Sequence, residues 1–142
     1  MYKTLLVPLD GSGNANKALD VAAQLARPGE GELYLLHIPE PGSASGTPAG
    51  TGPTHASGCT AEKSGRTIID NALDVVDPRD VRHHVLIIDG TPGEIIEREA
   101  IRLDADAIVM GHRGLTRGTG ESGGHVSREI LARAACRVIT VR

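Results

Sequence analysis

The sequence contains very few aromatic side chains: Trp and Phe are absent, and the two tyrosines are Tyr2 and Tyr34. The core of a 142-residue domain must therefore be built from Leu, Ile, Val and Ala. Single-stranded nucleic acids stack on aromatic rings, and nucleic-acid phosphates require a basic surface. Because aromatic residues are scarce and the net charge is −3, we expect no nucleic-acid partner.

Cysteines, targeting signals and long apolar runs are also scarce. Cys59 and Cys136 are the only cysteines, which is too few for a disulfide framework. The N-terminal MYKTLLVPLD does not have the layout of a signal peptide, and no apolar run approaches the length of a membrane span. We therefore expect a soluble, cytoplasmic protein without a membrane partner.

Five short segments carry Leu, Ile and Val in the pattern of β-strands. They are TLLVPL (4–9), ELYLLHI (32–38), VRHHVLII (81–88), DAIVM (106–110) and RVITV (137–141). Several of them are almost continuously apolar, which is typical of parallel strands that helices cover on both faces.

Segments with apolar residues at helical spacing lie between these strands. The predicted helix faces are Ala15, Ala18, Leu19, Ala22 and Ala26; Ile68, Ile69, Ala72, Leu73 and Val76; Ile96, Ala100 and Leu103; and Val126, Ile130, Leu131 and Ala134. The alternation predicts a single three-layer α/β/α domain over residues 1–142 with right-handed crossovers. Residues 39–60 have no apolar period and predict a flexible loop, either an inert linker or a lid.

Ligands of such folds bind at the carboxyl ends of the strands, where the strand order reverses. After the first strand, Gly11 and Gly13 begin a dinucleotide fingerprint, but Asn16 replaces its third glycine, and the Asp10 charge would repel a pyrophosphate, so we reject it. Two interpretations of Asp10 stay open: its carboxylate accepts hydrogen bonds from ribose hydroxyls, or it caps the following turn.

The second candidate connection is GHRGLTRGTGESGGHVS, residues 111–127. Gly111 follows a buried strand, so the chain leaves that strand at a residue that is free to adopt a positive φ, and Gly123 and Gly124 precede a helix that begins near His125 or Val126. The N-terminus of a helix can bind phosphate through free N–H groups and its dipole. Because the stretch lacks Gly-Lys-Ser/Thr, it is not a Walker loop. Glycine content alone is equally compatible with a flexible connection that holds nothing.

Three blocks of sequence, in order and correctly spaced, resemble the universal stress protein family. MYKTLLVPLDGSGNANKALDVAAQLA resembles its first strand, Asp-Gly-Ser turn and first helix, and GTPGEIIEREAIRLDADAIVMGHRG its third helix and fourth strand. HVSREILARAACRVITVR resembles its last helix and strand. Gly111, Gly114 and Gly124 match Gly-x2-Gly-x9-Gly-(Ser/Thr), the nucleotide loop of the ATP-binding subgroup of that family.

The resemblance implies a Rossmann-like parallel sheet of order 3-2-1-4-5, as in adenine nucleotide α-hydrolases, which binds ATP, ADP or AMP, with Mg²⁺ as a further candidate, at strands 1 and 4. It also implies a role in stress response or signalling, and a homodimer through residues 137–141. Carried over residue by residue, Asp10 binds the ribose, and the backbone near Ile38, with Pro8 and Leu9, frames the adenine. The residues implied at the phosphates are Gly111, Gly114, Gly124, His125 and Ser127, and the same site includes Met110, His112, Arg113 and Val126.

The chain departs from the family pattern at His125, where the motif has Ser or Thr. Imidazole is positively charged only below about pH 6.5, so affinity should rise as pH falls if His125 contacts a phosphate. In the alternative that we favour, the ring faces solvent and backbone N–H groups of residues 125–127 bind the phosphate. The insert LTRGTGESG lacks the family's leucines, so we expect it to be mobile without ligand. Arg113 and Arg117 either cover a phosphate or are solvated.

The remaining candidates favour binding over catalysis. His83 and His84 face opposite sides of a strand, and His55 with Cys59 supply too few zinc ligands. We expect Cys136 to be structural. No catalytic triad or paired carboxylates stand out, and no residue is a convincing general base. The leading hypothesis is a nucleotide-binding protein with at most weak ATPase activity; the alternatives are a dimeric scaffold that binds no nucleotide and a slow ATP hydrolase.

Overall fold

The computed structural model describes residues 1–39, 57–78, 80–112 and 125–142. Strands and helices alternate along the chain, and the strands form one parallel sheet of order β3-β2-β1-β4-β5. The bounds are β1 Thr4–Pro8, α1 Gly13–Ala26, the 3-10 turn η1 Arg27–Gly29, β2 Glu32–His37, α2 Ser57–Val75, β3 Arg82–Ile87, α3 Pro92–Arg102, β4 Ala107–Gly111, α4 His125–Arg133 and β5 Arg137–Val141. The predicted α/β fold and the strand order are confirmed.

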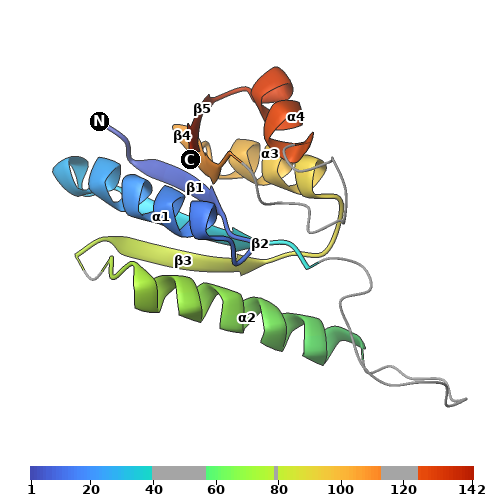
Figure 1. Ribbon diagram of the computed structural model, residues 1–142. Coiled ribbons are helices and arrows are strands. Elements are labelled where there is room, and N and C mark those ends of the chain that lie inside the picture. Colours follow the sequence, from blue (N-terminus) through green and yellow to red (C-terminus); the bar gives the residue numbers. More distant parts are fainter. Residues whose placement is uncertain (40–56, 79, 113–124) are drawn as a thin grey trace, which may run out of the picture.

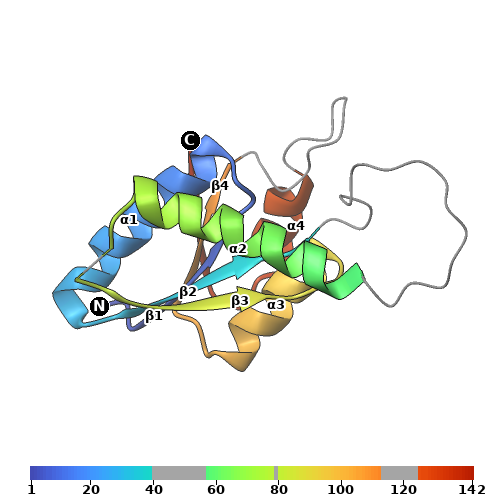
Figure 2. The same ribbon diagram turned by 90° about the horizontal axis from the view of Figure 1, so that it is seen from below.

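The central strand β1 alternates its side chains between two apolar cores, one on each face of the sheet. Leu5, Val7 and Leu9 pack with α1 and α2, whereas Leu6 packs with α3 and α4. Figures 1 and 2 show α2 running along β3 and α3 lying beside α4. As the composition requires, the fully buried side chains are aliphatic, and the buried alanines of α1 allow that helix to approach the sheet closely.

The predicted strands differ from the observed ones only at their ends. Leu9, Ile38 and Ile88 lie just beyond strands that we expected to include them. The N–H of Leu9 still donates to the carbonyl of Leu36 (2.7 Å), and that of Ile88 to the carbonyl of His37 (3.1 Å). These bonds continue the sheet's pattern one residue further, so the carboxyl edge of the sheet is well ordered where the candidate site begins.

The second helix begins earlier than expected. Its apolar period starts at Ile68, but α2 spans Ser57–Val75, so residues 57–60 are helical although we assigned them to the loop 39–60. The first turns of α2 extend past the carboxyl end of β3 in both views (Figures 1 and 2). A helix segment that does not face the sheet needs no apolar stripe, which is why periodicity missed it. The loop residues 40–56 lie outside the described part of the chain.

Candidate functional site

The carboxyl ends of β1 and β4 lie side by side at the point where the strand order reverses. The chain proceeds from β1 through β2 to β3 in one direction and then from β4 to β5 in the other. Leu5 pairs with Ala107, and Leu6 with Ile108. Helices that leave neighbouring strands in opposite directions open a crevice at this edge. The two connections selected from the sequence therefore meet at one place.

Gly111 ends β4 and brings that strand into contact with the first turn of α1. A Cβ at Gly111 would lie 3.0 Å from the carbonyl carbon of Asn14 and 3.1 Å from the nitrogen of Ala15. Gly111 does not use the positive φ that a glycine permits, because the described glycines with positive φ are Gly11 and Gly90. Gly111 is instead suited to its position because it has no side chain, which allows two backbone segments to approach closely.

The carboxylate of Asp10 has two differently placed oxygens. Oδ1 accepts a hydrogen bond from the N–H of Ser12 (2.9 Å), and the Ser12 hydroxyl in turn caps α1 by accepting from Ala15 (3.2 Å). Oδ2 is buried and has no hydrogen-bond partner among the described residues. One of the open interpretations is thus seen directly, since Asp10 does fix the turn. The second interpretation, in which Asp10 accepts hydrogen bonds from ribose hydroxyls, is compatible with the structure because Oδ2 lacks a donor among the described residues.

The N-terminus of α4 is tied to the end of β4. The hydroxyl of Ser127 donates to the carbonyl oxygen of His112 (3.1 Å), and the N–H of His112 donates to the carbonyl of Val141 at the end of β5 (2.8 Å). Ser127 is buried, whereas His125, the first residue of α4, is exposed. The helix therefore starts where the sequence predicted, with its N-terminus at the carboxyl edge of the sheet.

Several predicted site residues belong to the core. Leu9 packs on the α1 side of the sheet, and the other apolar ones pack on the α3 side: Ile38, Met110 and Val126. Pro8 is also buried. Buried side chains of this kind shape the floor of a site, so any hydrogen bonds from these positions must come from their backbone groups.

One polar residue at this edge was missed by the sequence analysis. His37, at the end of β2, is 8% exposed, and its Nδ1 lies 2.8 Å from the carbonyl oxygen of Leu9. A Cβ on Gly65 of α2 would lie 2.8 Å from the Cδ2 of His37, so α2 packs directly on the ring. His37 thereby holds the residue that precedes Asp10. Its signal was available, since it is the polar residue near the end of the apolar segment ELYLLHI.

Part of the predicted site falls outside the described residues. This applies to Arg113, Gly114, Arg117 and Gly124, to the insert 115–123, and to His55 of the earlier loop. Their predicted roles stay predictions.

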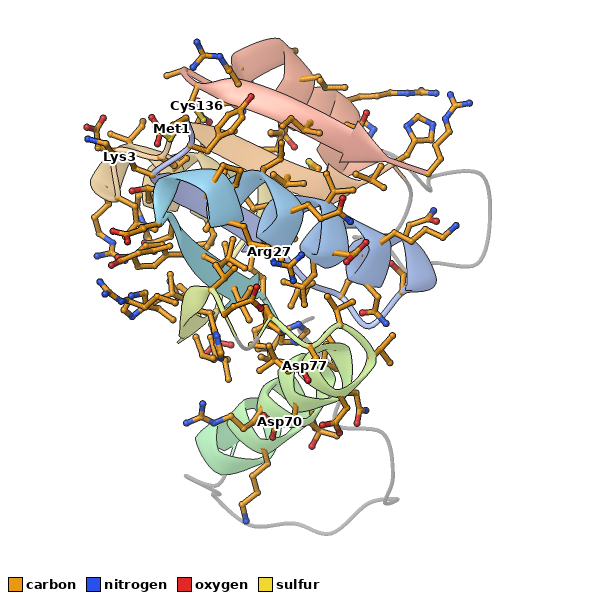
Figure 3. All side chains as sticks on the ribbon, turned by 90° about the vertical axis from the view of Figure 1, so that its left-hand side faces the viewer. Met1, Lys3, Arg27, Asp70, Asp77 and Cys136 are labelled. Carbon is orange, nitrogen blue, oxygen red and sulfur yellow. The ribbon has the colours of Figure 1, made fainter. Side chains whose placement is uncertain are left out.

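The weaker candidates have structural contacts instead. The ring of His84 stacks on Tyr34 at 4.7 Å and lies 3.2 Å from Glu32 Oε2. Cys136, labelled in Figure 3, has a free, half-buried thiol, and burial raises its pKa, which disfavours the reactive thiolate. Within residues that the structure describes, no three His, Cys, Asp or Glu side chains are grouped as a metal site requires. The described helices include none long and apolar enough to cross a membrane.

Comparisons with known proteins agree with this geometry. The sequence model of the Universal stress protein family matches residues 1–142. A universal stress protein of Thermus aquaticus is 32% identical over 142 residues, which cover 100% of both chains. A universal stress protein from Archaeoglobus fulgidus, solved in complex with dAMP, is 23% identical with a TM-score of 0.66, covering 99% of this chain and 98% of that one. A universal stress protein solved in complex with cAMP is 21% identical with a TM-score of 0.71, covering 99% and 97%.

Proposed function

Because the chain belongs to the universal stress protein family, we propose that it binds an adenine nucleotide (ATP, ADP or AMP) at the carboxyl ends of β1 and β4. The observation that carries the proposal is the Oδ2 of Asp10, which is buried and has no donor among the described residues. A buried carboxylate oxygen without a donor is unfavourable in the free protein, and a ligand hydroxyl would satisfy it. The relatives solved with dAMP and cAMP support an adenine nucleotide as that ligand.

In this proposal each part of the nucleotide meets a different element. Asp10 accepts from the ribose, and the backbone near Ile38, with Pro8 and Leu9, borders the adenine. The phosphates lie at the N-terminus of α4, where the helix dipole and free N–H groups favour negative charge. Gly111 and the turn at Asp10 are adjacent through the first turn of α1, so ribose and phosphate sites are within reach of one ligand. The further predicted contacts are Met110, His112, Arg113, Gly114, Gly124, His125, Val126 and Ser127.

The hydrogen bonds of Ser127 refine its proposed role. Its hydroxyl proton is already directed to the carbonyl of His112. A phosphate would therefore be bound by the backbone N–H groups of residues 125–127, with the hydroxyl holding the helix in place. The same reasoning assigns the exposed ring of His125 a minor part. Mg²⁺ would arrive with the phosphates of ATP, where it would neutralise part of their charge.

The proposal is tested by measuring whether purified protein carries or accepts a nucleotide. Mass spectrometry of the ligand released from pure protein should identify ATP, ADP or AMP. Added nucleotide at 100 times its Kd should stabilise the fold by about 2.7 kcal/mol, which a thermal melt detects readily. Absence of both results for all three nucleotides would exclude the proposal and favour the dimeric scaffold that binds no nucleotide.

The proposal includes the family's wider implications. We infer a role in stress response or signalling in the cytoplasm, with at most slow hydrolysis. We also infer a homodimer through β5, which is the edge strand next to β4 and therefore has one unpaired side. Sedimentation velocity would test this: a monomer at micromolar concentration contradicts the dimer without affecting nucleotide binding.

A further inference from the structure

The strand β3 forms the edge of the sheet opposite to β5, and the described residues place no strand on its outer side. The N–H of Ile88 donates to the carbonyl of His37 in β2 (3.1 Å). Backbone groups alternate in direction along a strand, so those of His83, Val85 and Ile87 point away from β2. A row of unpaired N–H and C=O groups of this kind is a template for another strand.

The side chains of β3 are also less buried than those of the inner strands. Residues 85–88 are all half-buried, whereas the apolar residues of β1 and β4 are buried. β3 contains neither Lys nor Pro, two residues that commonly protect an exposed edge from pairing. The edge therefore keeps apolar surface that a further partner would bury.

One flank of α2 runs beside this edge (Figures 1 and 2). Ile69 is buried against the sheet, and Ile68 lies beside the turn at Gly11, on the side of α1. Successive helix residues are turned by about 100°, so Arg66 and Asp70 lie on the opposite flank, here called the outer flank, beside the outer side of β3. Both residues are exposed. A partner strand at β3 would therefore meet this flank as well.

A second copy of β3 can pair with the first across a two-fold axis at Val85. The two strands are then antiparallel, as such an axis requires. His83 pairs with Ile87 of the second copy and Val85 with its own equivalent, so all three outward residues gain backbone partners. Arg82 lies opposite Ile88, so the two arginines stay apart.

The same axis brings the two α2 helices into contact. A Cβ at Gly65 would lie 2.8 Å from His37 of β2 and 3.2 Å from Ile87 of β3, so α2 lies between these strands. With strands about 4.8 Å apart, the two helices would lie about 10 Å apart, a usual separation of packed helices. With a rise of about 1.5 Å per helix residue and about 3.3 Å per strand residue, Val85 is level with Asp70.

The charges of the outer flank are arranged for an antiparallel neighbour. The basic Lys63 and Arg66 precede the acidic Asp70 and Asp74 along α2, and all four are exposed. Across the axis, the basic part of each flank meets the acidic part of the other. The two Asp70 carboxylates approach near the axis, where Arg66 of the other copy, about one helical turn away, offsets their repulsion. This pattern favours a second copy of the chain over an unrelated strand.

We propose that the outer side of β3 and the outer flank of α2 pair with the same surface of a second copy of this chain. The pairing continues the sheet of one chain into that of the next through antiparallel β3 strands. It lies at the opposite edge from the proposed β5 dimer and does not depend on nucleotide binding. Both contacts together would link four or more chains.

Cysteine crosslinking tests the position of the axis, in a chain that carries Cys59→Ser and Cys136→Ser. Val85→Cys would place two Cα atoms about 5.5 Å apart across the paired strands, which is within the range of a disulfide. Oxidised glutathione should therefore convert most of this variant into a covalent dimer on a non-reducing gel. Val75→Cys is the matched control, because Val75 is 71% exposed on α2 but lies outside the outer flank. It should give no covalent dimer.

Charge reversals on the outer flank test the helix contacts by sedimentation velocity. Arg66→Glu and Asp70→Arg should each weaken association about tenfold, because the two-fold axis repeats every lost ion pair. The double variant restores opposite charges and should associate within about threefold of wild type. Ser64→Glu is the control, since Ser64 is exposed on α2 outside the outer flank. It should leave association unchanged.

Absence of the covalent Val85→Cys dimer would overturn the pairing. Reversals that weaken association no more than Ser64→Glu does would overturn it as well. Because β5 lies at the other edge of the sheet, failure of the proposed β5 dimer would halve the size of the assembly without changing the crosslink or the effect of the reversals. The two contacts are therefore tested separately.

Discussion

The polar groups at the two edges of the sheet differ in whether they have hydrogen-bond partners within the described chain. At the amino edge, the Oδ2 of Asp106 accepts from the N–H groups of Lys3 (2.7 Å) and Thr4 (2.9 Å), and Arg27 pairs with Asp80 at 2.8 Å. At the carboxyl edge, the Oδ2 of Asp10 is buried and has no partner among the described residues. Asp106 and Asp10 are both carboxylates at the end of a strand, yet only one is satisfied by its own chain.

If the proposed nucleotide binding is correct, the amino edge contributes stability and the carboxyl edge contributes affinity. Carboxylates that are hydrogen-bonded or ion-paired within the chain stabilise the fold without a ligand. A carboxylate with a spare, buried oxygen weakens the free protein and gains a partner on binding. Substitutions should therefore separate the edges: those at the amino edge should reduce stability, and those at the carboxyl edge should reduce affinity.

The largest effect is expected for Gly31→Ala at the amino edge. A Cβ at this buried position would lie 2.5 Å from the carbonyl oxygen of Tyr2, so the start of β2 must shift away from β1. We expect a loss of about 3 kcal/mol in the free energy of unfolding, measured by urea denaturation. Gly13→Ala, at the carboxyl edge, is the control, because nothing lies within 4 Å of its added Cβ. Equal losses in both variants would contradict this contrast between the edges.

Asp10→Asn, at the carboxyl edge, should reduce the affinity for ATP and have little effect on the free energy of unfolding. The amide can keep the bond to the N–H of Ser12, so the free energy of unfolding should change by less than about 0.5 kcal/mol. The ribose loses a charged acceptor, so affinity for ATP should fall roughly 10- to 100-fold. Titration calorimetry gives the affinity, and urea denaturation of the same sample gives the stability. A strongly destabilised variant with normal affinity would assign Asp10 to the fold alone.

Asp106→Ala should reduce the free energy of unfolding by about 1–2 kcal/mol, because it removes the acceptor of two backbone N–H groups. The loss is no larger because Asp106 is partly exposed and solvent screens part of its charge. The backbone N–H groups of Thr4 and Lys3 hold the pKa of Asp106 below its usual value. A lowered folded-state pKa gives stability that is complete above the unfolded pKa, about 3.9, and is lost as the pH falls through the folded pKa. The difference between wild type and variant should thus be constant near pH 7 and shrink below about pH 4.

Urea denaturation across this pH range measures the effect of Asp106. Asp89→Ala is the control at the other edge, since Asp89 is exposed and the described residues give it no hydrogen-bond partner. It should leave both the stability and its pH dependence unchanged. A pH-independent difference for Asp106→Ala would show that packing, rather than the carboxylate, carries its contribution.

The smallest effect is expected for His125→Ser, which restores the residue type of the family motif. If backbone N–H groups bind the phosphate, affinity for ATP should change less than about threefold at pH 8. The dependence of affinity on pH between 6 and 8 should also be the same in both proteins. A wild-type affinity that rises steeply as pH falls, and no longer does so in the variant, would instead assign the phosphate contact to the imidazole.

The strands and most of the helices were predictable because apolar periodicity is a local property of the sequence. Apolar period located the strands to within a residue or two, and the resemblance supplied their order. The start of α2 was not predictable, since residues that do not face the sheet carry no period. The sequence could not show how Gly111 is used, because whether a glycine serves a turn or a close approach depends on its neighbour, here Asn14.

The sequence predicted the residues of the candidate site that the family motif contains, but not the residues that surround them. Motif spacing identified Asp10 and the start of α4. It could not identify Asn16 and Asn71, which line one pocket with Asp10 only because α1 and α2 pack near the turn after β1. Nor could it show that the two oxygens of Asp10 differ, because that depends on the path of the turn. Side chains brought together by tertiary packing leave no signal in a single sequence.

The bond between Ser127 and His112 has a consequence for how this chain can change over evolution. The two residues lie on either side of the segment 113–124 that precedes α4, and their contact at 3.1 Å ties the start of α4 to the end of β4. The entropy of closing a loop depends only weakly on its length once its ends are held. Residues inserted, deleted or exchanged within that segment therefore leave the position of α4 and its N–H groups unaltered. The chain can diverge between the glycines of its family motif while the N-terminus of α4 keeps its position relative to β4.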